Sequence, residues 1–123
     1  MSTTSVLSLA SVLEAGTGLL LIIDPGLVVT LLLGQDLTRQ GQLLGNLAGI
    51  ALLALGLACW PGSQSNPAAW RGMLAYNLLA TLFLAYLGCV MASVGKLLWP
   101  AVALHSMITV LLYKAPAGKE SNG

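Results

Sequence analysis

The sequence predicts an all-α integral membrane protein, a four-helix transmembrane bundle with short loops and a short interfacial helix after the first span. Three observations predict this class. Charged residues make up 7% of the 123 residues, against roughly a quarter in a soluble domain. Hydrophobic residues make up 57%, which leaves too little polar surface for a water-facing globule. Four apolar stretches can each cross the roughly 30 Å hydrocarbon layer as a helix: residues 6–23, 43–60, 73–92 and 97–113.

Four spans fill the chain, so we expect a single transmembrane domain over residues 1–123 and no second domain. Membrane lipid is therefore the expected surrounding of most side chains. The net charge of +1 argues against a nucleic acid partner, because a phosphate-binding face needs several clustered Lys or Arg residues.

The first apolar run extends to Leu33 and is too long for one straight span. Asp24 and Pro25 are the expected break, because Pro lacks a backbone donor and Asp followed by Pro is typical of a helix start. We therefore expect the first span to end before Asp24 and a short helix over residues 27–33 to lie at the interface. The alternative is one span over residues 16–33 that is kinked at this dipeptide.

Proline and glycine also mark the ends of the other helices. Pro61 and Gly62 are expected to end the second helix, and Asn66 and Pro67 to cap and start the third. Pro100 falls within the first turns of the fourth helix, where a missing amide donor costs little. The short connections require neighbouring helices to be antiparallel.

An even number of spans places both termini on one side of the membrane. That side collects three cationic residues, Arg71, Lys114 and Lys119, against Arg39 and Lys96 on the other side. The positive-inside rule then favours cytoplasmic termini. We expect the protein to lie in a bacterial inner (plasma) membrane.

A few polar residues fall where lipid makes them costly. Glu14 lies at the middle of the first span and His105 at the middle of the fourth. An ionisable side chain at that depth costs about 3 kcal/mol, so both are expected to face the bundle interior and to meet. Asn77, with Tyr76 beside it and Thr81 one turn deeper, is expected to complete the cluster.

This cluster has two interpretations. As a binding or proton-relay site, Glu14 would take up and release a proton, His105 would exchange it, and the amide of Asn77 would orient a ligand. As a structural feature, it would supply interhelical hydrogen bonds worth about 0.6 kcal/mol each.

Glycine is concentrated on one face of the second helix. Gly45 and Gly49 form a GxxxG motif, and Gly56 lies farther along nearly the same face. Such a face lets another backbone approach closely. The sequence leaves open whether the partner helix belongs to the same chain or to another subunit.

Soft metal ligands are present but poorly spaced. Cys89 with Met91, and His105 with Met107, stand two residues apart, so each pair points to opposite sides of its helix. We therefore expect no metal site. No catalytic, cofactor or nucleotide motif stands in the chain. Cys59 falls at the span end opposite to that of Cys89, which excludes a disulfide within one chain.

Three functions remain. The first is a non-enzymatic accessory module that binds another membrane protein through the glycine face. The second is a homo-oligomeric proton-linked carrier or channel for a small solute that uses Glu14 and His105. The third is an intramembrane enzyme or a binder of a lipid-soluble ligand, with Tyr76 beside the same cluster.

The helix layout resembles that of many small bacterial membrane proteins, the DoxX-like group among them, in size and hydropathy. This resemblance carries no residue motif, so it implies no activity.

Overall fold

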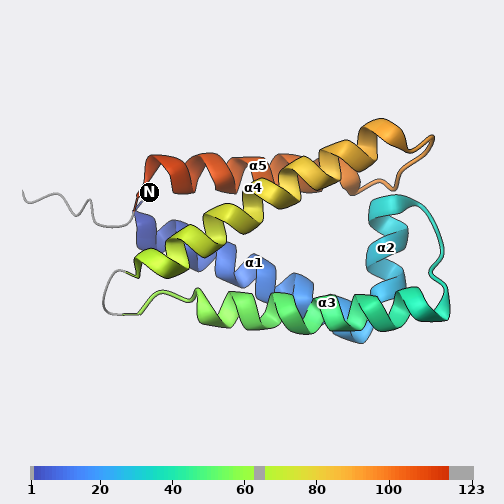
Figure 1. Cartoon of the computed structure of the whole chain (residues 1–123), viewed down its shortest axis with the longest axis horizontal. Coiled ribbons are helices and arrows are strands. Elements are labelled where there is room, and N and C mark those ends of the chain that lie inside the picture. Colours follow the sequence, from blue (N-terminus) through green and yellow to red (C-terminus); the bar gives the residue numbers. More distant parts are fainter. Residues whose placement is uncertain (1, 63–65, 117–123) are drawn as a thin grey trace, which may run out of the picture.

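The computed structural model describes residues 2–62 and 66–116, and within these ranges the chain is all-helical (Figure 1). Lys119, one of the cations used to orient the chain, lies outside the described residues. No strand occurs in the described part. The helices are α1 (Thr3–Ile23), α2 (Pro25–Leu33), α3 (Arg39–Ala58), α4 (Pro67–Val90) and α5 (Leu98–Lys114).

Polar side chains cap the starts of α1, α2, α3 and α4. Asp24 accepts a hydrogen bond from the backbone N–H of Leu27 at 3.0 Å, and Pro25 follows as the first residue of α2. Asn66 likewise caps α4, with Pro67 as its first residue. The two helix starts expected at Asp-Pro and Asn-Pro are thus present, because each carboxyl or amide oxygen bonds N–H groups that have no partner within the helix.

The first apolar run is broken at Asp24. Its backbone is far from helical, with φ −148° and ψ 81°, and α2 leaves the direction of α1 (Figure 1). Gly34 ends α2 in the left-handed region at φ 68°, where glycine has no Cβ to clash. The chain therefore forms two helices here and not one kinked helix over residues 16–33.

The long helices associate as two antiparallel pairs, α1 with α3 and α4 with α5. The pairs meet at the end that holds the start of α1, the end of α3, the start of α4 and the end of α5 (Figure 1). At the other end α2 bridges them. There the carbonyl oxygens of Leu32 and Leu31 accept the N–H groups of Gly95 at 3.0 Å and of Leu97 at 2.8 Å.

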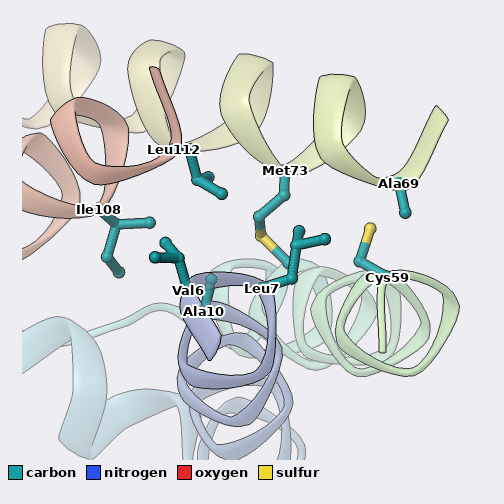
Figure 2. Close-up of a cluster of buried hydrophobic side chains, with 8 residues drawn as sticks. All are labelled: Val6, Leu7, Ala10, Cys59, Ala69, Met73, Ile108 and Leu112. Carbon is teal, nitrogen blue, oxygen red and sulfur yellow. The ribbon is translucent and has the colours of Figure 1, made fainter. Parts of the chain in front are cut away.

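The apolar core lies where the two pairs meet. Its side chains come from α1, α4 and α5 and from the end of α3, and they point toward one another in Figure 2: Val6, Leu7, Ala10, Cys59, Ala69, Met73, Ile108 and Leu112. Cys59 is a buried free thiol in this core, whereas the free thiol of Cys89 is exposed.

Most of the remaining apolar surface is exposed. On α3 the exposed fractions of Leu43, Leu44 and Leu47 exceed 60%, at 63%, 67% and 62%. Such a surface suits lipid as the surrounding solvent and not water. Three helices, α1, α3 and α4, are long and apolar enough to cross a membrane, and α5 is an apolar helix of 17 residues.

Candidate functional site

Glu14 is buried at the place where α1 faces the α4–α5 pair. The inward side of α1 repeats every three or four residues through Ala10, Glu14, Gly18 and Leu21, all of which are buried. The side chain of Glu14 is 2% exposed. The spacing of apolar residues along α1 thus carries a carboxyl group into the interior.

His105 approaches this carboxyl group from α5. Its Nδ1 atom lies 3.8 Å from Oε1 of Glu14. The side chain of Tyr76, on α4, lies beside the Glu14 carboxyl group. The rings of Tyr76 and His105 meet edge to face, with centroids 6.0 Å apart and planes at 77°. Three helices therefore each contribute one ionisable side chain to one cluster.

Asn77 holds the His105 ring. Its Oδ1 atom is 2.8 Å from Nδ1 of His105, and its Nδ2 donates to the backbone carbonyl of Met73 at 3.0 Å. Asn77 is fully buried, whereas the His105 side chain is 16% exposed. His105 is consequently the more accessible partner of this pair.

Two buried polar atoms have no hydrogen-bond partner among the residues that the structure describes. They are Oε1 of Glu14 and Oγ of Ser11, three residues apart on α1. Buried polar atoms in folded proteins are nearly always paired, so each exception calls for an explanation. A free carboxyl oxygen can accept a further donor, which gives the cluster the capacity to take up a proton or a hydrogen-bond donor.

Thr81 lies one turn beyond Asn77 on α4. Its hydroxyl group donates to the carbonyl of Asn77 in its own helix at 2.8 Å. Among the described residues, no hydrogen bond joins this hydroxyl group to Glu14 or His105. Of the five residues predicted for the cluster, the structure brings together Glu14, Tyr76, Asn77 and His105, and Thr81 only supports the backbone below Asn77.

The glycine face of α3 packs against α1 of the same chain. A Cβ atom built on Gly49 would lie 2.6 Å from the carbonyl oxygen of Gly18, and one on Gly56 would lie 2.7 Å from that of Ser11. A Cβ atom built on Gly45 would lie 2.6 Å from the Cβ atom of Pro25, the first residue of α2. Gly49 and Gly56 therefore allow backbone contact with α1, and Gly45 leaves room for the side chain of Pro25.

Sequence reasoning missed the role of Asn46. Its amide Nδ2 donates to the carbonyl oxygens of Leu21 and Ile22, at 3.1 and 2.9 Å. These carbonyls lose their helical partners because Pro25 has no N–H and the helix ends at Asp24. Part of the signal was present, because Pro25 leaves a carbonyl of α1 without a donor, but the sequence does not show that Asn46 lies beside it.

Within residues 2–62 and 66–116, no group of three or more His, Cys, Asp or Glu side chains is placed to hold a metal ion. Comparisons with models of protein families, with curated proteins and with solved structures find no match to this chain. Fold and site together describe an all-helical protein with three helices able to cross a membrane and a buried polar cluster between its helix pairs.

Proposed function

We propose that α1, α3, α4 and α5 form a four-helix membrane bundle, with α2 at one membrane surface. The 17 residues of α5 extend about 26 Å, which is within the range of spanning helices. Charged residues mark the end bridged by α2, since Asp36 and Arg39 follow α2 and Lys96 precedes α5. Charged side chains prefer the headgroup region to the hydrocarbon core, which supports an interfacial α2.

We also propose that both termini face the cytoplasm of a bacterial cell whose inner membrane holds the protein. The side with the termini carries Arg71, Lys114 and Lys119, and the α2 side carries Arg39 and Lys96. The positive-inside rule favours the side with more cations as cytoplasmic.

We infer that the chain works as a proton-linked carrier or channel for a small solute, with Glu14 and His105 exchanging the proton. The observation that carries this inference is the unpartnered Oε1 atom of Glu14, buried 3.8 Å from Nδ1 of His105. A cluster that served only to join helices would gain from having every polar atom bonded. Burying the Glu14 carboxyl group with an unpaired oxygen costs free energy, and a role in proton exchange explains why this cost is tolerated.

A solute path would require several copies of the chain, because four helices leave little space among their side chains. The outward leucines of α3 offer a surface on which copies could associate. We therefore propose a homo-oligomer as the working form.

An accessory role, in which another membrane protein binds the glycine face, would need that face to be accessible. Gly49 and Gly56 are buried against α1. A partner protein would instead have to bind the outward face of α3, around Leu47 and Ile50, which are 62% and 56% exposed. The accessory function therefore has less geometric support than proton exchange.

Proton flux into sealed vesicles tests the proposed function. Vesicles that contain the wild-type protein should dissipate an imposed pH gradient faster than empty vesicles, and Glu14→Gln should return the rate to that of empty vesicles. Ser11→Ala is the matched control, because it removes the other unpartnered polar atom of α1 but no titrating proton. Unchanged flux in a folded Glu14→Gln protein would reject the proposal.

A further inference from the structure

The hydrogen bonds of Asn77 determine which ring nitrogen of His105 carries hydrogen. Its amide has two ends with opposite hydrogen-bonding character. The Nδ2 end lies 3.0 Å from the carbonyl oxygen of Met73, which can only accept. The reverse orientation would place two oxygens against each other at this distance, so the carbonyl of Met73 fixes Nδ2 where it is.

The other end of the amide then faces the ring. Oδ1 of Asn77 lies 2.8 Å from Nδ1 of His105, and an amide oxygen can only accept. The hydrogen of this bond must therefore belong to Nδ1. In the neutral ring only one nitrogen carries hydrogen, so Nε2 is left with its lone pair free.

We propose that Asn77 is a positioning residue that holds the neutral His105 ring in the Nδ1–H form, so that protons enter at Nε2 and leave from Nδ1 to Glu14. The direction of transfer rests on the proton-exchange function proposed above, whereas the state of the ring follows from the hydrogen bonds alone.

The transfer balances in two steps. A hydronium ion protonates Nε2 and leaves water, which makes the ring an imidazolium with hydrogen on both nitrogens. The Nδ1–H bond then breaks, its electron pair stays on nitrogen, and an O–H bond forms on Oε1 of the Glu14 carboxylate. This second step requires the 3.8 Å gap between Nδ1 and Oε1 to close by about 1 Å, to the length of a charge-assisted hydrogen bond.

Asn77 also favours the return of the His105 ring to its Nδ1–H form. After the transfer the hydrogen remains on Nε2, and the lone pair of Nδ1 faces Oδ1 of Asn77, which is unfavourable for two acceptors 2.8 Å apart. Nδ1 then takes a proton from a second hydronium ion, and Nε2 releases its own proton to water, so the ring returns to the neutral Nδ1–H form and this repulsion is relieved. The ring thereby resets for the next proton.

The chain has a single histidine, so nitrogen NMR of protein labelled with ¹⁵N-histidine reports on His105 alone. Protonated and unprotonated ring nitrogens resonate in separate ranges. At a pH where the ring is neutral, the wild-type protein in lipid nanodiscs should show hydrogen on Nδ1. Asn77→Ala should lose this preference, and Asn77→Asp, which keeps an acceptor at the same position, should retain it.

Thr81→Ala is the matched control, because Thr81 bonds the backbone of Asn77 and not its side chain. It should leave the Nδ1–H form unchanged. Hydrogen on Nε2 in the wild type would overturn the inference, and this measurement needs no variant to fold. An unchanged Nδ1–H form in Asn77→Ala would also overturn the inference. Proton flux tests the proposed function separately from the state of the ring. If flux is absent while hydrogen lies on Nδ1, only the proton-exchange function is rejected.

Discussion

Gly18 and Gly49 face each other across the α1–α3 contact, and a Cβ atom built on either would lie 2.6 Å from the carbonyl oxygen of the other. Real Cβ atoms do not approach backbone oxygen so closely. The two helices therefore touch through their backbones, and this contact sets the position of α1 and with it that of Glu14.

Gly49→Ala should lower the stability of the protein by about 1–3 kcal/mol, because the added methyl group must push α1 and α3 apart. Gly16→Ala is the matched control. Gly16 lies on the outer side of α1 with no atom within 4 Å of an added Cβ, so this change should be neutral or slightly stabilising. Thermal denaturation in detergent measures both, and equal melting temperatures for the two variants would contradict the backbone contact.

Asn46→Leu should destabilise the protein by about 1–3 kcal/mol, because it removes the donor that the partly buried carbonyls of Leu21 and Ile22 share. Gln42→Leu, one turn earlier at an exposed position of α3, is the control and should cost much less. Denaturation of both variants in the same detergent makes the comparison. A stable Asn46→Leu protein would mean that these carbonyls find another donor.

Much of the fold follows from local signals in the sequence. The starts at Asp24 and Asn66 were predictable because side-chain caps and prolines act within a few residues. The position of α2 was not predictable, since it depends on backbone bonds from Gly95 and Leu97, more than 60 residues away.

The residues of the candidate site were predictable from the sequence, but their hydrogen-bond partners were not. The depth expected for Glu14, Asn77 and His105 in a membrane predicted that these polar residues face inward. Thr81 was assigned to the same cluster because depth alone does not show that a hydroxyl group bonds its own helix. The role of Asn46 depends on how α3 lies against the end of α1, which no single segment encodes.

Cysteines placed at positions 14 and 105 should crosslink. The Glu14→Cys and His105→Cys changes, in a background with Cys59→Ala and Cys89→Ala, place two thiols at positions whose native atoms Oε1 and Nδ1 lie 3.8 Å apart. Because cysteine is shorter than either native side chain, a short bifunctional thiol reagent is used to join the two thiols. Gly16→Cys paired with His105→Cys is the control, because position 16 is on the outer side of α1 and should not crosslink. Mass spectrometry of the protein after treatment with the reagent distinguishes the pairs, and equal yields from both would contradict the packing of α1 against α5.

A double-mutant cycle on proton flux tests most directly the central claim that Glu14 and His105 act as one proton-exchange unit. Glu14→Gln, His105→Gln and the double variant are reconstituted in vesicles at equal density, and dissipation of the same pH gradient is measured. Two residues in one relay should each abolish the protein-dependent flux when changed singly, and the double variant should lose nothing more. Substantial flux in either folded single variant, or losses that add in the double variant, would contradict the claim.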